Sequence, residues 1–228
     1  MPARTVSELR VLHVDNHLLV VAKPAGLPVV PDESGDESLL ERARAWVQRE
    51  FGKPGKAFLG VVHRLDRPVS GVVVFARTSK GAQRLSQAFR SRAVEKVYWG
   101  VSAVAPRSPS GRLEQWLWKD RERNVVRVLE RERPGAQLAI TAWREVARAG
   151  GGRCLLELRP ETGRPHQLRV AAASLGAPLL GDLKYGAREG LPDRSIALHA
   201  RALELPHPTR RERLRFECPA PELDVWRF

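Results

Sequence analysis

The chain has 228 residues, 43% of them hydrophobic and 29% charged, which is typical of a globular protein long enough to bury a core. Its 39 Lys and Arg residues against 26 Asp and Glu give a formal net charge of +13, which favours a polyanionic partner such as nucleic acid. Two cysteines, Cys154 and Cys218, are too few for a disulfide framework or a metal cluster, and no segment reads as a signal peptide or membrane span, so we expect a cytoplasmic protein. Arginines that merely coat the surface remain the alternative explanation of the charge.

Hydrophobic periodicity predicts short strands and two helices in the first half of the chain. Apolar residues recur at helical spacing ahead of Gly52, a residue type that often follows a helix end. In chain order we expect two strands within 10–21 around a turn at 15–17, a Pro/Gly turn at 23–29, a helix carrying Leu39, Leu40, Ala43, Trp46 and Val47, strands near 60–63 and 72–76, and a helix carrying Ala82, Leu85, Ala88 and Phe89.

The second half is richer in strands. Residues 107–133 are dense in arginine with alternating apolar positions, which indicates a strand pair or a basic flap. Strands are also expected at 94–104 and around 138–146, 153–159 and 196–205, and a helix with a buried face carries Leu168, Ala171, Ala172 and Leu175. Many strands with few, irregularly placed helices predict an α+β fold with a mixed, largely antiparallel central sheet flanked by helices and loops. We see no linker, so residues 1–228 are expected to form a single domain.

The segment "VVHRLDRPVSGVVVF" places four ionisable side chains within five residues between two apolar runs: His63, Arg64, Asp66 and Arg67. Neighbouring cations favour the ionised form of a carboxylate such as Asp66. A structural ion pair at a strand end would have the same residue pattern. A kinase catalytic loop is excluded, because it needs Asp directly after Arg together with a Gly-rich loop and a downstream Asp-Phe-Gly.

Two further clusters carry polar side chains in suggestive positions. In "TGRPHQLR" (162–169), Gly163 and Pro165 lead into a helix whose first turn offers free N–H groups, and His166 and Arg169 share a face; this could be a phosphate or RNA-backbone cradle. In "EKVYW" a strand would place Lys96 and Tyr98 on one face, although a lone strand tyrosine is usually packing. The sequence shows no glycosidase acid pair, serine-nucleophile elbow or zinc-ligand spacing.

These segments together resemble the RluA-type family of RNA pseudouridine synthases. The motifs "HRLDRPVSGVVVFART", "EKVYWGV" and "RPETGRPHQLRV…LGAPLLGDLKYG" occur in the family's order, with matches also at "VLHVDNHLLVVAKPAGLPV" and "LHARALELPHP", so the similarity spans about 12–216. The resemblance implies the pseudouridine synthase catalytic fold with an active-site cleft across the sheet. It also implies a monomeric enzyme that isomerises specific uridines of rRNA, tRNA or both, with RNA as its partner and no cofactor, metal or membrane.

The resemblance also implies roles for individual residues. Asp66 matches the catalytic aspartate, Tyr98 the tyrosine that stacks on the target uracil, and Arg169 the arginine that pairs with the carboxylate. Arg64 matches the arginine that helps to hold RNA with the base extruded, and Leu198 the apolar residue beneath the site. RNA binding or support is expected of the remaining members of the motifs: His63, Arg67, Lys96, Arg164 and His166.

The chemistry is consistent with this resemblance. Breaking the N-glycosidic bond and rejoining the uracil through a ring carbon is an isomerisation, which needs no redox cofactor. A stacked uracil must be flipped out at a cost of a few kcal/mol, of which aromatic stacking returns roughly 1–3 kcal/mol. Asp66 would attack the sugar carbon or remove a proton beside it, and the sequence leaves both open.

The sequence departs from the family pattern in places. Ala171 stands where a histidine is usual, Val69 where threonine is usual, and no room is expected for the small N-terminal RNA-binding domain of many relatives. Two rival functions are a catalytically silent RNA-binding or assembly factor on the same fold, and a metal-dependent hydrolase using Asp66 with the distant Asp182. The arginine-dense 107–133 stretch fits RNA-backbone binding, but an ordinary solvated hairpin would look the same.

Overall fold

The computed structural model describes residues 9–52, 55 and 57–228 and contains three α-helices among them. The helices are α1 (Leu39–Phe51), α2 (Ser79–Arg90) and α3 (Gln167–Ser174), and short 3₁₀ turns span Gly150–Gly152, Leu183–Tyr185 and Asp224–Trp226. The strands are β1 (Arg10–Val14), β2 (Leu18–Lys23), β3 (Gly60–Val61), β4 (Ser70–Ala76), β5 (Glu95–Ser102), β6 (Ser110–Asp120), β7 (Val125–Leu129), β8 (Gln137–Arg148), β9 (Cys154–Pro160), β10 (Leu198–Pro206) and β11 (Arg213–Glu217). None of these helices is long and apolar enough to cross a membrane.

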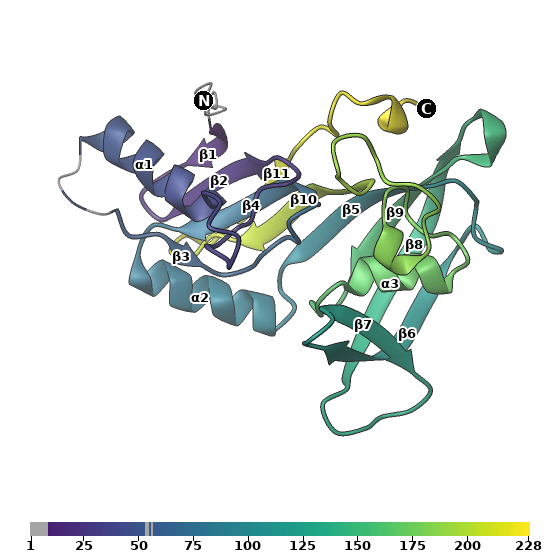
Figure 1. Ribbon diagram of the computed structural model, residues 1–228. Coiled ribbons are helices and arrows are strands. Elements are labelled where there is room, and N and C mark those ends of the chain that lie inside the picture. The colour runs from purple at the N-terminus through teal and green to yellow at the C-terminus, as the bar shows by residue number, and fades with distance from the viewer. Residues whose placement is uncertain (1–8, 53–54, 56) are drawn as a thin grey trace.

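All these strands join one sheet, shown in Figure 1. Its main path runs β1-β2-β4-β10-β5-β9-β8-β6-β7, with β3 against β4 and β11 against β10. The β4–β10 pair is parallel and the other pairs are antiparallel. The predicted α+β fold with a mixed, largely antiparallel sheet is therefore confirmed.

Most predicted elements lie where the sequence placed them, and the exceptions have local causes. The strand expected near 60–63 is only two residues long, because the His63 ring accepts the Val74 N–H at 3.0 Å where a longer β3 would have paired. The helix expected to include Leu175 ends one residue earlier. Strand β11 was not predicted, since Leu214 and Phe216 are its only apolar residues. The arginine-dense segment forms the predicted strand pair, β6 and β7.

Helices α1 and α2 cover opposite faces of the sheet in its N-terminal half (Figure 1). Leu19 and Phe75 pack in the cluster that contains α1, whereas Val20 and Val74 pack in the cluster that contains Leu85 of α2. Because both faces are buried, β2 and β4 read as continuous apolar runs rather than alternating ones.

The ends of α1 follow from its sequence. Ser38 forms a capping box with Glu41 at the start of the helix, and Gly52 ends it in the left-handed conformation with φ of 55°. The predicted helix stop at Gly52 is thus confirmed, and the Pro/Gly segment after β2 leads into a loop that brings α1 back over the sheet.

The C-terminal half carries α3 on one face, and the β6–β7 hairpin extends from it (Figure 1). Val170 of α3 packs with Leu117, Val126 and Ala139 in a small cluster that joins the helix to the hairpin and β8. The two halves meet where β4 runs parallel to β10. There Gly71, with φ of 122°, lets the strands approach: a Cβ at this position would lie 2.4 Å from the Ala200 carbonyl oxygen.

Candidate active site

A cleft of about 1080 Å³ opens where the two halves of the sheet meet. Its lining comes from the loop between β3 and β4, from β5 and β10, and from the segment that leads into α3. All ten side chains singled out in the sequence line it: His63, Arg64, Asp66, Arg67, Lys96, Tyr98, Arg164, His166, Arg169 and Leu198. Segments more than 100 residues apart in the chain thus form one site, and the expected cleft across the sheet is present.

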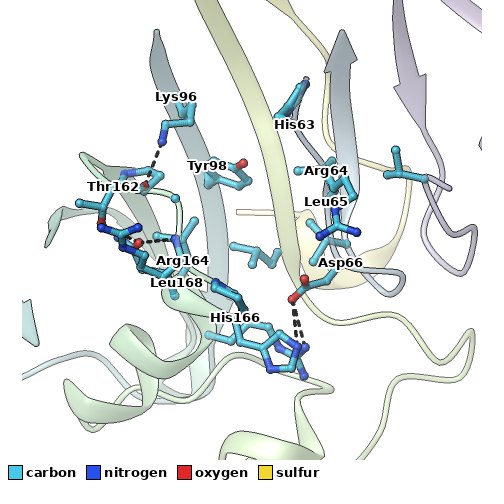
Figure 2. Close-up of a pocket in the computed structure, with 18 of the residues that line it drawn as sticks. His63, Arg64, Leu65, Asp66, Lys96, Tyr98, Thr162, Arg164, His166 and Leu168 are labelled. Carbon is cyan, nitrogen blue, oxygen red and sulfur yellow. Dashed lines mark hydrogen bonds and ion pairs between the residues drawn. The ribbon is translucent and has the colours of Figure 1, made fainter. Parts of the chain in front are cut away.

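Asp66 lies in the loop between β3 and β4, which is held on both sides of it by buried apolar residues. Leu65 and Val69 are 7% and 2% exposed, and the Val69 N–H donates to the Asp66 carbonyl at 3.0 Å, closing a turn. The Asp66 carboxylate itself is 32% exposed and points into the cleft (Figure 2). Anchored neighbours therefore hold a partly solvated acid in a defined position.

Arg169 joins Asp66 to a second, buried carboxylate. Its Nη1 donates to Asp66 Oδ2 at 3.2 Å, and its Nε and Nη2 donate to the two oxygens of Asp182 at 2.7 Å each. Asp182 is 1% exposed. Burial by itself would lower the pKa of Arg169, but the hydrogen bonds that Arg169 donates to Asp182 and the charges of Asp182 and Asp66 outweigh burial and raise that pKa, so the guanidinium stays charged.

The cation that pairs with Asp66 is Arg169, as the resemblance implied, whereas the flanking arginines that were expected to keep Asp66 ionised do not pair with it. Arg67 instead bonds the Gly26 carbonyl at 2.9 Å and pairs with Asp36 and Asp32, tying down the loop before α1. Within the described residues, the exposed Arg64 makes no ion pair or side-chain hydrogen bond. In a turn, the side chains of neighbouring residues point in different directions, so closeness in the sequence did not predict which of them would pair.

His166 also approaches Asp66, from the residue that caps α3. The helix begins at Gln167, and His166 is left-handed with φ of 51°, a conformation that histidine adopts more readily than most residues. Its Nε2 is 3.9 Å from Asp66 Oδ2, and its Nδ1 is 2.6 Å from the Tyr185 hydroxyl. Burial lowers the pKa of His166 to about 4, although the charge of Asp66 opposes this. The predicted common direction of His166 and Arg169 is confirmed, but His166 precedes the helix.

Tyr98 and Leu198 form the apolar part of the cleft. They lie on the adjacent strands β5 and β10, and Figure 2 shows the Tyr98 ring between the Asp66 side and the Lys96 side of the cleft. Burial, followed by the charge of Asp66, raises the pKa of Tyr98, so its hydroxyl stays protonated. An aromatic ring and a leucine next to a carboxylate form a surface that suits a flat, partly polar ring.

Lys96 shares the cleft-facing side of β5 with Tyr98, as the strand periodicity predicted. Its Nζ donates to the Thr162 carbonyl at 3.0 Å, which leaves further N–H groups for a ligand (Figure 2). Burial, and then the charge of Arg92, lower the pKa of Lys96 to about 8. Lys96 is thus a cation at neutral pH that titrates within an accessible range.

His63 and Arg164 are engaged with the scaffold. The His63 ring stacks on Phe89 of α2 at 4.8 Å, and burial lowers its pKa to about 3, so it stays neutral and accepts the Val74 N–H. Arg164 Nε donates to the Leu138 carbonyl at 3.0 Å. Both side chains line the cleft, yet their polar atoms brace its walls.

Sequence reasoning missed three residues that shape the site. Asp182 was weighed only as a distant acid, and Tyr185 was not singled out, although both lie in the "GDLKYG" segment. Gln167 is satisfied on every side: its Oε1 accepts from Thr162 and from the Arg164 N–H, and its Nε2 donates to Ile140 and Thr141. The available signal for a buried network was a polar residue directly before Leu168, the first predicted apolar position of the helix.

Lys23 is a buried cation behind the Asp66 loop. It is 2% exposed, and its Nζ donates to the carbonyls of Pro24 and Arg67 at 2.9 and 3.0 Å. Burial lowers the pKa of Lys23 to about 7, while the charge of Asp66 opposes this. Lys23 therefore joins the end of β2 to the residue that follows Asp66.

Carboxylates do not gather here as a metal site would require. Among the residues that the structure describes, no group of three or more His, Cys, Asp and Glu side chains could hold a metal ion. Both oxygens of Asp182 are bonded to Arg169, which stands between it and Asp66. The two carboxylates, Asp66 and Asp182, are thus bridged by the Arg169 guanidinium.

Comparisons with known proteins agree with this geometry. The family model described as RNA pseudouridylate synthase matches residues 17–174. The chain belongs to this family. An uncharacterized RNA pseudouridine synthase, YhcT of Bacillus subtilis, is 36% identical over 94% of the chain and 69% of its own length. The dual-specificity RNA pseudouridine synthase RluA of Salmonella typhi is 34% identical over 93% of each, which marks the chain as a synthase of the RluA type.

A solved structure agrees as well. The human RNA pseudouridylate synthase domain containing 4 superposes with a TM-score of 0.77 at 27% identity, covering 93% of this chain and 89% of that one. The synthase thus has both the sequence motifs and the fold of the family, and RNA is its substrate.

Proposed function

We propose that Asp66 is the catalytic carboxylate of this RNA pseudouridine synthase, and that it acts on uridines of rRNA, tRNA or both after the target base has been flipped into the cleft. The observation that carries the proposal is the state of its two oxygens. Oδ2 is held by Arg169 at 3.2 Å, whereas within the described residues Oδ1 makes no hydrogen bond, and the side chain lines the cleft. The other acids of the cleft, Asp32 and Glu161, pair with Arg67 and Arg112.

The reaction fits one open carboxylate oxygen. The bond between the ribose carbon and the uracil nitrogen breaks, the uracil turns, and a ring carbon bonds to the same ribose while its hydrogen leaves to water. Asp66 Oδ1 would attack the sugar carbon or remove a proton beside it. Either step needs an ionised carboxylate aimed at the ribose, and Arg169 supports both requirements by its charge and its two-point anchor on Asp182.

The flipped uracil would stack on Tyr98 above Leu198. Its ring is available on the cleft side of β5, and aromatic stacking is worth roughly 1–3 kcal/mol per base, which offsets part of the cost of unstacking the RNA. The closed surface around Leu198, which is 3% exposed, excludes water from one face of the base.

RNA phosphates would bind the cations that the protein leaves unpaired. Arg64 projects above Asp66 at the mouth of the cleft (Figure 2), and Lys96 faces it across the opening. Five exposed arginines of the β6–β7 hairpin and the loop after it have no ion pair or side-chain hydrogen bond within the described residues: Arg121, Arg123, Arg127, Arg131 and Arg133. Of the two roles expected from the sequence, RNA contact suits Arg64 and Lys96, whereas support suits His63, Arg67 and Arg164.

The test is tritium release from RNA transcribed with uridine labelled at ring carbon 5, with tRNA and rRNA fragments offered separately because the proposal covers both. We expect release by the wild type in EDTA, none by Asp66→Asn, and near-normal release by Glu161→Gln, a control that changes a paired acid of the same cleft. Binding of RNA without release would favour the catalytically silent RNA-binding protein. Release that EDTA abolishes would contradict the metal-free mechanism.

A further inference from the structure

Tyr185 is the contact shared by the Asp66 centre and the β6–β7 hairpin. Its hydroxyl lies 2.6 Å from His166 Nδ1 and accepts the N–H of Val126, in β7, at 2.8 Å. The Arg169 guanidinium carbon lies 5.0 Å from the Tyr185 ring centroid. One side chain therefore touches both groups that flank Asp66 and the backbone of the hairpin.

The hydrogen bonds at Tyr185 assign the proton of His166. Within the described residues the hydroxyl bonds only the Val126 N–H, from which it accepts, and His166 Nδ1, so Nδ1 is the acceptor left for the hydroxyl proton. Neutral His166 then carries its hydrogen on Nε2, the atom 3.9 Å from Asp66 Oδ2. Burial keeps the ring neutral by lowering the pKa of His166 to about 4. The charged groups that face His166 are Asp66, which opposes that shift, and Arg169, Lys119 and Lys184, which add to it.

The hairpin is held at the same point by independent contacts. Val126 packs with Leu117, Ala139 and Val170, against Tyr185. Lys184, next to Tyr185, donates from Nζ to the carbonyl of Asn124 at the hairpin turn, at 3.2 Å. A shift of the hairpin would therefore disturb the hydrogen bond between the Val126 N–H and the Tyr185 hydroxyl.

We propose that Tyr185 is a positioning residue that fixes the Nε2–H form of His166 beside Asp66 and makes this arrangement depend on the docked position of the β6–β7 hairpin. The catalytic consequence rests on the role proposed for Asp66. The neutral Nε2–H group gives the Asp66 side of the cleft a second donor besides Arg169, and it is oriented only while Tyr185 is in place. RNA held by the hairpin and the chemistry at Asp66 are thereby linked through one hydroxyl.

The variant that isolates this hydroxyl is Tyr185→Phe, which keeps the ring against Arg169. The chain offers a matched control in Ser174→Ala, because the Ser174 hydroxyl also bridges α3 to the hairpin strands, accepting from Gln115 Nε2 at 2.8 Å, yet it does not touch His166. We expect Tyr185→Phe to slow single-turnover tritium release about tenfold with RNA affinity changed less than about twofold, and Ser174→Ala to change neither.

A double-variant cycle separates positioning from general structural damage. Gln at position 166 carries its own amide donor, which needs no tautomer, so Tyr185→Phe should have little further effect in a His166→Gln background. Equal slowing by Tyr185→Phe in both backgrounds would overturn the proposal, as would normal release by Tyr185→Phe.

Nitrogen-15 NMR of the histidine rings tests the arrangement without activity. His166, assigned from the signal missing in His166→Gln, should show the Nε2–H form in the wild type and in Ser174→Ala, and a mixture of forms in Tyr185→Phe. An Nδ1–H form in the wild type would overturn the proposal. If the wild type released no tritium, the role of Asp66 would fail, and the spectra alone would decide whether Tyr185 sets the state of His166.

Discussion

Two basic regions of this synthase differ in whether their cationic side chains are buried and paired or exposed and unpaired. At the centre, Arg169 is 6% exposed and bonds two carboxylates, and Lys23 is 2% exposed and bonds two carbonyls. On the hairpin, Arg121, Arg123 and Arg127 are exposed, and within the described residues their guanidinium groups bond no acid. The same residue types thus serve as fixed parts of a site in one place and as free charges in the other.

We interpret this difference as a division between residues that position the catalytic carboxylate and residues that bind RNA. A buried, paired cation is costly to place and cannot search for a ligand, but it holds a carboxylate in one position. An exposed, unpaired cation contributes little to folding and remains free for a phosphate, with a strength that depends on salt. Substitutions at the centre should therefore change the rate of the bound complex, and substitutions on the hairpin should change RNA affinity.

The largest effect is expected from Asp182→Asn. Removing one partner of a buried ion pair leaves the Arg169 charge poorly compensated, so we expect the free energy of unfolding to fall by about 3 kcal/mol. Arg169 would also lose its two-point anchor, and a misplaced group of this kind costs about 100-fold in rate. Single-turnover release at saturating RNA, in samples checked for folding by denaturant titration, measures both. An unchanged rate in the folded variant would show that Asp66 needs no such anchor.

On the hairpin, Arg123→Gln with Arg127→Gln should weaken RNA binding roughly tenfold and reduce the slope of log Kd against log salt by about 1.5, since each phosphate contact contributes roughly 0.7–0.9. The rate at saturating RNA should stay normal. The matched control is Arg213→Gln with Arg215→Gln, which removes the same charge from arginines paired with Glu204 and Glu217. Equal weakening by both pairs would mean that only net charge matters and would remove the distinction between the regions.

Lys96 is intermediate between the two kinds of cation, because it is partly buried yet remains open to a ligand. Because burial lowers its pKa to about 8, its positive charge is present below pH 8 and lost as the pH rises through that value. We expect RNA affinity to fall about fivefold between pH 7 and pH 9. Lys96→Arg, charged throughout this range, should abolish this dependence. Persistence of the pH effect in Lys96→Arg would assign it to another group.

A further effect concerns the pH dependence of stability at His199, on β10. His199 is 1% exposed, bonds Ser70 and the Cys218 carbonyl, and has its pKa lowered to about 4 by burial, although the bond to Cys218 opposes this. Between pH 6.5 and pH 4 the unfolded chain therefore binds a proton that the folded chain does not, so stability falls as the pH falls, by about 2 kcal/mol at pH 5. His199→Gln should flatten this part of the curve of unfolding free energy against pH. A curve of unchanged shape would assign acid sensitivity to other groups.

Much of this protein could be predicted from local patterns. Periodicity placed α1 with its stop at Gly52, the alternation of Lys96 and Tyr98 on β5, and the strand pair of the basic segment, because these depend on neighbours within one turn or one strand. The motifs also contain the ten predicted site residues, all of which line the cleft. The directions of individual side chains could not be predicted in this way. Arg67 follows Asp66 in the chain but pairs with Asp36, and the His63 ring stacks on Phe89.

The sequence by itself determined the fold class, the RNA-modifying family and the identity of the side chains that meet in the cleft, since motif order and apolar spacing are properties of the chain. The resemblance implied that Arg169 pairs with Asp66, but only the tertiary structure revealed that Asp182 anchors Arg169 and that Arg67 pairs with Asp36. Asp182 is 13 residues from Arg169, and Arg169 is 103 residues from Asp66, yet the parallel pairing of β4 with β10, which joins the two halves of the sheet, brings all three together. Ion pairs and tautomers depend on distances of a few ångströms between such segments, and spacing along the chain does not contain them.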